Sequence, residues 1–360
     1  MFAVLAAATL ALQGAAAPGF DGARQSIDAA VHAGTIPGAV LVVGRGAEVL
    51  HESVHGERSP GVTMTLDTVF DLASLTKSVA TSSSIMVLVQ EGKLALSDRV
   101  SSILPAFKGA DRDAITVEEL LLHTAGLAPV NHLDDYREGP AKALERICAG
   151  ELRSAPGEAF IYSDLGYILL GEIVEAVSGE PLDDFSARHV FGPLGMAETG
   201  YGPLGVELLG RCAPTSPDGS GVGVVHDPRA RALGGVAGHA GVFSTAADLS
   251  RFCAMLAGAG GERSPLGPEA LAELLRPRIL EGGAVARALG IAVASPYDSP
   301  RGSRFPRYVS MGHTGFTGPC YWVDRASGVW YLLLVSRLQK DPAPSMSPLR
   351  RAVADAVAAA

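Results

Sequence analysis

The sequence is poor in the features that mark nucleic-acid-binding and membrane-spanning proteins. Its 360 residues carry a formal net charge of −9, and no run of lysine and arginine is longer than the Arg350-Arg351 pair. Because a nucleic-acid partner requires a basic patch, this composition argues against one. No segment approaches the roughly 20 apolar residues that cross a bilayer, so we expect no stable membrane span. With 48% hydrophobic and 19% charged residues, the chain has ample material for a packed core.

Cysteine is scarce, and its pattern indicates neither a metal site nor a disulfide framework. No C-x-x-C pair occurs, and no histidine stands nearby at metal-ligand spacing; the four cysteines are Cys148, Cys212, Cys253 and Cys320. A disulfide is therefore neither implied nor excluded. The sequence also has no internal repeat and no G-x-S-x-G, which disfavours a hydrolase with a nucleophile elbow. It gives no indication of the oligomeric state.

The N-terminal segment has the pattern of a secretory signal. An apolar stretch from Phe2 to Leu12 is followed by the small residues Ala15 to Ala17 before Pro18. A basic segment ahead of the apolar stretch is missing, so a first helix of the fold and a misassigned start codon stay open as alternatives. We expect residues 1–17 to be a signal peptide and the protein to be periplasmic or secreted, or cytoplasmic if this segment is not a signal.

The segment from His51 to His55, HESVH, matches the H-E-x-x-H signature of zinc peptidases. That signature works on a helix, where the two imidazoles lie on one face. Here an apolar run at 39–43, a Gly-Arg-Gly turn and a second apolar run instead predict a β-hairpin. On a strand, His51 and His55 would lie roughly 13 Å apart at about 3.3 Å per residue, too far to share one zinc. We therefore expect a strand here and no metal.

Strand patterns occupy both ends of the chain, and helical patterns occupy its middle. The strand patterns cover residues 34–54 and 303–336. Apolar periodicity and helix-end signals predict helices over 72–91, 165–179 and 347–360. Another helix is predicted to begin at Thr116, which forms a capping box with Glu119.

This order of elements predicts an α+β fold. A central antiparallel sheet would be built from residues 18–71 and 285–360 and flanked by the terminal helices. Residues 72–284 would form an inserted, mostly helical domain. The active site would lie in the cleft between the two parts.

One S-x-x-K stands near the start of the helix predicted over 72–91, at Ser74 and Lys77. Residues at i and i+3 are neighbours on a helix, so the lysine amine would reach the serine hydroxyl. A serine hydroxyl is a poor nucleophile until a base takes its proton, and an amine can do so only if its pKa is lowered. The chain has 24 arginines but five lysines, and Lys77 alone among these lysines has a serine three residues before it.

Two further short elements follow this pair, Tyr162-Ser163-Asp164 and His313-Thr314-Gly315, at intervals of roughly 90 and 150 residues. The order SxxK, Y-x-N/D, [KH]-T-G resembles the serine β-lactamase and penicillin-binding protein superfamily. The stretches TVFDLASLTKSVAT, VEELLLHTAGL, PGEAFIYSDLGYILLGEIVE and GGVAGHAGVFSTAADLSRF are similar to its class C, D-alanyl-D-alanine carboxypeptidase and esterase-like branch. The resemblance covers most of residues 25–340 and implies the β-lactamase/transpeptidase-like fold.

Carried over by position, the resemblance implies a serine hydrolase that uses no metal or cofactor. Ser74 would form an acyl-enzyme, Lys77 would be its partner in proton transfer, and Tyr162 would be the general acid/base. The backbone N–H groups of Ser74 and Phe316 would form the oxyanion hole. The substrate would be bound by Asp164, His313, Thr314 and Gly315. It would be a small molecule: an ester, a β-lactam or a D-alanyl peptide.

Two positions depart from the usual motifs. Asp164 replaces an asparagine, and a carboxylate near Lys77 would raise the pKa of that lysine and favour the ammonium. Lys77 would then act as a cation that leaves the Tyr162 phenolate as the base. His313 replaces the lysine of most β-lactamases and would be only partly charged near neutral pH. This tilts the prediction toward a D-Ala-D-Ala carboxypeptidase or an esterase without choosing between them.

The leading hypothesis is therefore a serine hydrolase that cleaves a small ester or a D-alanyl amide. The alternatives are a β-lactamase proper, a penicillin-interactive sensor that deacylates slowly and, disfavoured, a zinc peptidase. Two histidines within the matching stretches are interpreted as structural. We expect His123 to end a helix and to bond to backbone. His239 is expected to belong to a structural loop, with a part in shaping the cleft as the alternative.

Overall fold

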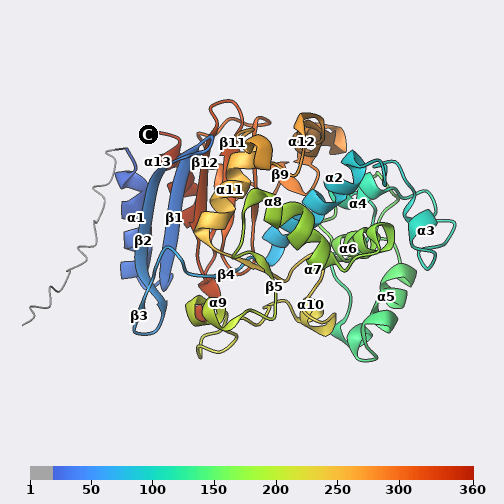
Figure 1. Cartoon of the computed structure of the whole chain (residues 1–360), viewed down its shortest axis with the longest axis horizontal. Helices are drawn as coiled ribbons and strands as arrows, with labels where there is room; N and C mark the ends of the chain where they lie inside the picture. The colour runs from blue at the N-terminus through green and yellow to red at the C-terminus, as the bar shows by residue number, and fades with distance from the viewer. Residues whose placement is uncertain (1–18) are drawn as a thin grey trace, which may run out of the picture.

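A nine-stranded antiparallel sheet organises the fold, in the order β3-β2-β1-β12-β11-β10-β9-β8-β7 (Figure 1). This computed structural model describes residues 19–360, so the predicted signal peptide at 1–17 lies outside the described residues. The strands of this sheet are β1 (Gly38–Arg45), β2 (Glu48–Ser59), β3 (Val62–Thr63), β7 (Arg278–Leu280), β8 (Val285–Ala288), β9 (Ile291–Ala294), β10 (Ser310–Thr314), β11 (Cys320–Asp324) and β12 (Val329–Leu334).

The sheet joins the two ends of the chain at its middle, where β1 pairs with β12 and Val42 lies opposite Leu332. Both strands are nearly continuous apolar runs because helices cover both faces of the sheet at this point. Leu41 and Val43 face the terminal helices α1 (Asp21–His32) and α13 (Ser347–Val357), whereas Val40 and Val42 face the larger core on the opposite side. The predicted antiparallel sheet from the two termini, flanked by terminal helices, is confirmed.

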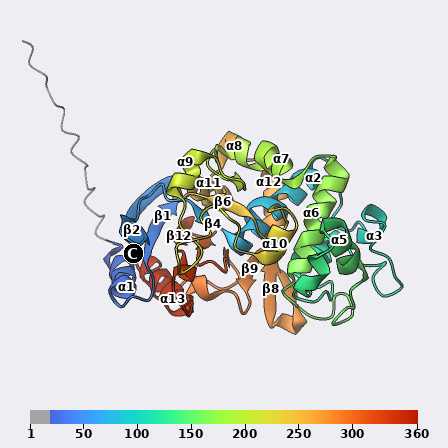
Figure 2. The ribbon, with the colours of Figure 1, turned by 90° about the horizontal axis from the view of Figure 1, so that it is seen from below.

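Most helices come from the middle of the chain, and α2, α4, α5 and α6 lie together on the right of Figure 1, away from β1 and β2, as Figure 2 also shows for α2, α5 and α6. The helices are α1 (Asp21–His32), α2 (Ser83–Gln90), α3 (Val100–Ile103), α4 (Val117–Leu122), α5 (Pro140–Ala149), α6 (Asp164–Ser178), α7 (Leu182–Ser186), α8 (Gly192–Leu194), α9 (Val206–Arg211), α10 (Pro228–Ala232), α11 (Ala246–Leu256), α12 (Pro268–Leu275) and α13 (Ser347–Val357). A small sheet of order β4-β6-β5 lies among them, with strands β4 (Phe70–Asp71), β5 (Gly200–Tyr201) and β6 (Val242–Ser244). None of the helices within residues 19–360 has the length and apolar character needed to cross a membrane.

The helix ends follow the sequence signals closely. The Thr116 hydroxyl accepts a hydrogen bond from the Glu119 N–H at 3.3 Å, and the Glu119 carboxylate accepts one from the Thr116 N–H at 2.8 Å, which is the predicted capping box of α4. The C-terminal part of the sheet begins with β7 (Arg278–Leu280). The sequence predicts the start of this part at residue 285.

The HESVH segment lies in β2, as predicted, but its two imidazoles approach each other more closely than a strand spacing suggests. The Ser53 hydroxyl lies between them, 3.2 Å from His51 Nε2 and 2.9 Å from His55 Nε2. His55 Nδ1 in turn contacts the Asp28 carboxylate of α1 at 2.6 Å. The spacing of about 13 Å describes the backbone, and the side chains lean together over Ser53. Each ring is thereby bonded to protein groups, and the network joins β2 to α1.

Candidate active site

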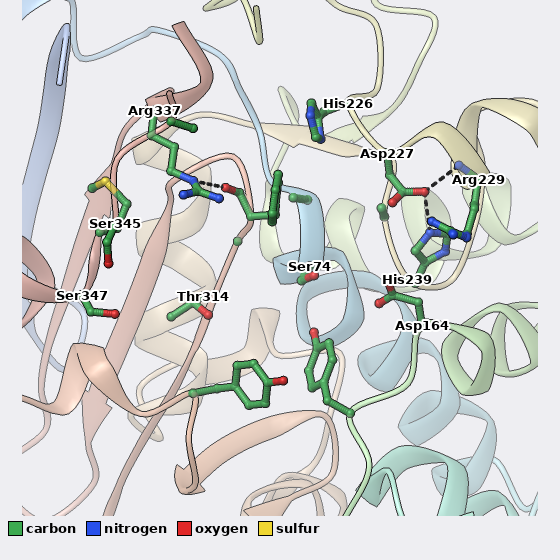
Figure 3. A pocket seen from close by; sticks show the side chains of 18 of the residues that line it. Ser74, Asp164, His226, Asp227, Arg229, His239, Thr314, Arg337, Ser345 and Ser347 are labelled. Atoms are coloured by element: carbon green, nitrogen blue, oxygen red, sulfur yellow. Dashed lines mark hydrogen bonds and ion pairs between the residues drawn. The ribbon is translucent and has the colours of Figure 1, made fainter. Parts of the chain in front are cut away.

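A cavity of about 750 Å³ opens beside Ser74, between the end of β10 and the helical part of the chain (Figure 3). Eight separate segments of the chain supply its walls. Among the lining residues are Ser74, Tyr162 and Asp164, Asp227 and His239, Thr314 to Phe316, and Arg350. Residues far apart in the sequence therefore meet around one serine.

Ser74 is held at the cavity by an irregular start to its helix. The helix predicted over 72–91 is a 3-10 turn at Ala73–Leu75, then a π-helix at Lys77–Ser82, and then α2. The Asp71 carboxylate accepts a hydrogen bond from the Ala73 N–H at 2.8 Å, and Ala73 has a φ of 46°, a left-handed conformation that costs a side-chain-bearing residue energy. Ser74 is the one residue from 71 to 80 that is not fully buried.

The Lys77 amine lies directly beneath the serine. Its Nζ is 3.2 Å from Ser74 Oγ, 3.1 Å from the His239 carbonyl oxygen and 2.7 Å from an Asp164 carboxylate oxygen. Its side chain is fully buried, and burial alone would lower the pKa of Lys77. The Asp164 carboxylate outweighs that effect and holds the pKa of Lys77 above its ordinary value, so the amine stays protonated.

Tyr162 lines the cavity and lies two residues before Asp164, the first residue of α6. The Ser163 hydroxyl caps α6 by accepting from the Gly166 N–H at 3.2 Å, while the Ser163 N–H donates to His123 Nδ1 at 3.1 Å. The Tyr162 ring lies 4.4 Å from the His123 ring, centroid to centroid, and 5.0 Å from Lys77 Nζ. His123 ends α4 in a left-handed conformation and accepts from backbone, as predicted, and it also supports the tyrosine ring.

The end of β10 brings the third motif to the same cavity. His313 is buried, with Nδ1 2.9 Å from the Thr314 carbonyl oxygen, and burial together with the nearby Arg287 and Lys77 cations holds its pKa well below the ordinary value. The imidazole is therefore neutral near pH 7, where a lysine would have been charged. Gly315 must be glycine, because a Cβ there would lie 2.5 Å from the Leu72 carbonyl oxygen.

The two predicted oxyanion-hole residues line the same cavity. Ser74 and Phe316 both line it, and the Phe316 side chain is 57% exposed. The Phe316 carbonyl accepts from Arg337 Nε at 2.6 Å, which fixes the peptide beyond β10. The role of Ser74 and Phe316 as an oxyanion hole stays a prediction.

His239 lies in a loop that forms part of the cavity wall, which fits the alternative that it shapes the cleft. His239 lines the cavity, its carbonyl accepts from Lys77, and its Nε2 lies 2.9 Å from an Asp227 carboxylate oxygen. Burial opposes ionisation of Asp227, but the hydrogen bond from His239 holds the pKa of that carboxyl well below its ordinary value. Asp227 escaped the sequence analysis because nothing in the composition of residues 203–241 distinguishes it from other loop residues.

Asp164, Asp227 and His239 each offer one ligand atom, and these atoms lie within 4.8 Å of one another. Such a group could hold a cation. The buried Lys77 ammonium already pairs with Asp164 at this point, so a positive charge is supplied by the protein itself.

Comparisons with known proteins identify the family of this chain. A family model described as Beta-lactamase matches residues 23–355. N-acetylmuramyl-L-alanine amidase of Bacillus subtilis (strain 168) is 30% identical over 357 residues, which cover 87% of this chain and 80% of the amidase. A protein of Escherichia coli (strain K12), provisionally named D-alanyl-D-alanine carboxypeptidase, is 33% identical over 230 residues, which cover 56% of this chain and 53% of that protein.

A solved structure shares the whole architecture. EstCE1, described as a hydrolase with promiscuous acyltransferase activity, superposes with a TM-score of 0.73 over 94% of this chain and 97% of its own, at 24% identity. At that identity the likeness concerns the fold. It places the nine-stranded sheet and the helical region in the arrangement of a known hydrolase.

Proposed function

The chain belongs to the β-lactamase family and is a serine hydrolase of that superfamily, and on this basis we propose that it forms an acyl-enzyme on Ser74 and cleaves a D-alanyl amide or a small ester. One observation carries the proposal. The Ser74 hydroxyl, the Lys77 ammonium and the Asp164 carboxylate form a continuous polar row at the cavity wall, with the Tyr162 ring above the ammonium. The candidate nucleophile thus has an ammonium at hydrogen-bond distance and a candidate general base, Tyr162, on the same cavity wall.

The geometry supports a mechanism in which the tyrosine is the base. Because Asp164 keeps Lys77 protonated, the amine cannot accept the serine proton, and the Tyr162 phenolate does so. The Ser74 oxygen then bonds to the substrate carbonyl carbon, and the N–H groups of Ser74 and Phe316 stabilise the oxyanion. Tyr162 passes the proton to the leaving amine or alcohol as its bond to carbon breaks. Water attacks the acyl-enzyme by the same route in reverse.

The charges in the cavity favour a substrate that carries a carboxylate, as a D-alanyl peptide does. His313 is neutral and cannot supply the cation, but Arg350 of α13 lines the same cavity. Its Nη2 is held by the carbonyl oxygens of residues 315, 318 and 319. Hydroxyl groups accompany it on the cavity wall, those of Thr314, Ser345 and Ser347. The names of the amidase and carboxypeptidase relatives agree with amide cleavage.

A substrate panel tests the proposal. Wild type, Ser74→Ala and the exposed-site control Ser102→Ala are assayed with a D-Ala-D-Ala peptide, p-nitrophenyl esters and nitrocefin. We expect wild type and the control to release D-alanine or p-nitrophenol and Ser74→Ala to lose at least about 1,000-fold in kcat/KM. The hydrolase proposal fails if Ser74→Ala keeps its turnover.

Other outcomes of the same panel identify the alternatives. Rapid nitrocefin turnover without peptide cleavage indicates a β-lactamase, and a persistent β-lactam adduct on Ser74 in an intact mass spectrum, without turnover, indicates a sensor. Chelator-sensitive activity that survives in Ser74→Ala but not in His51→Ala indicates the zinc peptidase.

A further inference from the structure

Asp71, the last residue of β4, is a buried carboxylate that the proposed mechanism does not use. It lies three residues before Ser74 in the chain. Its Oδ1 accepts a hydrogen bond from the Ala73 N–H at 2.8 Å, and its Oδ2 accepts one from the His226 N–H at 2.6 Å. Each oxygen of this carboxylate is therefore engaged by a backbone N–H group beside the active site.

The Oδ1 contact holds the turn that leads into Ser74. Ala73 has a φ of 46°, and a left-handed conformation persists in a residue with a side chain only where the surroundings fix it. An aspartate that accepts from the N–H two residues further on stabilises a turn in this way. Because Ala73 directly precedes Ser74, its conformation orients the peptide that carries the Ser74 N–H, one of the two predicted oxyanion donors.

The backbone carbonyl of Asp71 is bonded to the turn that carries the second predicted donor, Phe316. The Thr317 hydroxyl donates to this carbonyl at 2.7 Å, and Thr317, which directly follows Phe316, is buried. The two turns also pack closely, because a Cβ on Gly315 would lie 2.5 Å from the Leu72 carbonyl oxygen. Asp71 thus contacts both of the segments predicted to form the oxyanion hole.

The Oδ2 contact links Asp71 to the loop that holds Lys77. His226 directly precedes Asp227, whose carboxylate lies 2.9 Å from His239 Nε2 (Figure 3). The His239 carbonyl accepts from Lys77 Nζ at 3.1 Å, and the same amine lies 3.2 Å from the hydroxyl of the nucleophile. The contacts that begin at Asp71 therefore lead back to the nucleophile through the buried ammonium.

This carboxylate is costly to bury. Burial raises the pKa of Asp71 from 3.8 to about 6, although the two backbone hydrogen bonds oppose that rise. The charged and titratable groups that face it are Asp227, ahead of α10, Arg231 in α10 and the Cys212 thiol at the end of α9. Because the pKa is higher in the folded protein than in the unfolded chain, the carboxylate lowers stability as the pH rises through about 6. A residue that lowers stability beside a nucleophile is expected to serve the function.

We propose that Asp71 is a positioning residue for acyl transfer, and that its carboxylate and carbonyl together hold the backbone segments of Ser74 and Phe316 in the arrangement that stabilises the oxyanion. The inference rests on the proposed function of Ser74. Asparagine is not equivalent here, because an amide has one acceptor oxygen and its NH2 group would face one of the two N–H donors. Since the oxyanion develops only as the substrate reacts, Asp71 should act on kcat and not on KM.

Asp71→Asn tests this role by separating activity from stability. We expect kcat for the best substrate of the panel to fall about tenfold or more, with KM within about threefold of wild type. The midpoint of chemical denaturation, taken relative to wild type, should rise between about pH 5 and about pH 7.5, because the variant buries no charge. The control Asp98→Asn removes a carboxylate that accepts from the Ala95 N–H outside the cavity, and it should keep the kcat of wild type.

The outcomes for Asp71 and for the proposed function are distinguishable. A wild-type kcat in Asp71→Asn would overturn the positioning role, even if Ser74→Ala is inactive. A fall in kcat that disappears when the rate is expressed per folded molecule would show a purely structural contact and would overturn it as well. Turnover retained in Ser74→Ala would instead overturn the proposed function, while the denaturation midpoints would still report on the buried carboxylate. If Asp71→Asn does not fold, Asp71→Ser, whose hydroxyl can accept from the Ala73 N–H, takes its place.

Discussion

Asp164 decides what the buried Lys77 amine can do. A lysine buried without a partner loses its proton and becomes a base. With the carboxylate 2.7 Å away, the amine remains an ammonium and donates to Ser74 Oγ and to the His239 carbonyl. Lys77 therefore serves as a cation here because residue 164, two residues after Tyr162, is an aspartate and not the asparagine of the usual motif.

Asp164→Asn should move the alkaline limb of the kcat/KM profile to lower pH. Without the carboxylate, burial lowers the pKa of Lys77, so the ammonium is lost as the pH rises through a lower value than in wild type. The measurement is kcat/KM against pH with the best ester or peptide of the panel. Asp111→Asn, which removes an exposed carboxylate paired with Arg112, should leave the profile unchanged. An alkaline limb that stays in place in Asp164→Asn would show that Lys77 is not needed as a cation.

At the residue scale, the sequence predicted the parts of the site that depend on local geometry. The spacing of Ser74 and Lys77 fixes their contact on one helical turn, and the chemistry of an aspartate beside a lysine fixes the direction of the pKa shift of Lys77. Asp227 and Tyr297, which also line the cavity, were missed because their relevance depends on tertiary contacts. Neither composition nor periodicity indicates that the Tyr297 ring, in the loop after β9, lies 4.6 Å from the Tyr162 ring, centroid to centroid.

The Gly-rich segment of residues 234–241 is the element that connects Lys77 to the rest of the site. The Gly238 backbone lies so close to α6 that a Cβ at this position would be 1.9 Å from the Tyr167 carbonyl oxygen. The Gly238 carbonyl accepts from the Thr81 hydroxyl at 2.6 Å, and the next carbonyl, that of His239, accepts from Lys77. A loop of irregular backbone is thereby fixed between two helices.

Gly238→Ala should reduce activity by displacing this segment. The new methyl group cannot fit against the α6 backbone, so the loop must move and the His239 carbonyl must leave Lys77. We expect a loss of about 2 kcal/mol or more in stability by chemical denaturation and a drop of about tenfold in kcat. Gly210→Ala, where nothing lies within 4 Å of the new Cβ, serves as the control and should keep wild-type stability and activity. Equal stability and equal kcat in the two variants would contradict this account of the loop.

At the scale of elements, the hairpin and the capped helices followed from sequence because their signals are local. The π-helical turn after Ser74 did not, because it arises from contacts beyond its own residues. The left-handed Ala73 and the Asp71 carboxylate, which also accepts from the His226 N–H, set that start of the helix. The same limit explains HESVH, where the strand was predictable and the convergence of the two rings on Ser53 was not.

Across the whole molecule, stability rests on burial without disulfides. All four cysteines are free and buried, and burial raises the pKa of each thiol, to about 11 for Cys148 and for Cys212. A buried, protonated thiol is a poor nucleophile. The cores on the two faces of the sheet carry the fold instead.

The native protein should therefore be inert to a thiol reagent. We expect no reaction with Ellman's reagent at neutral pH and four reactive thiols after denaturation, with or without prior reduction. A reducing agent should leave the thermal midpoint unchanged. Fewer than four thiols in the unreduced denatured protein would reveal a disulfide and contradict the structure.

The pairing of β1 with β12 has a consequence for how the protein is made. β1 ends at residue 45 and its partner begins at residue 329, so one edge of the N-terminal hairpin stays open until nearly the whole chain has left the ribosome. Contacts this distant in sequence form slowly because a long loop must close first. The nascent chain thus passes through most of its synthesis without a completed sheet, and the open edge of β1 stays unpaired for that time. The central sheet can be completed only after its last strand, β12, has been synthesised.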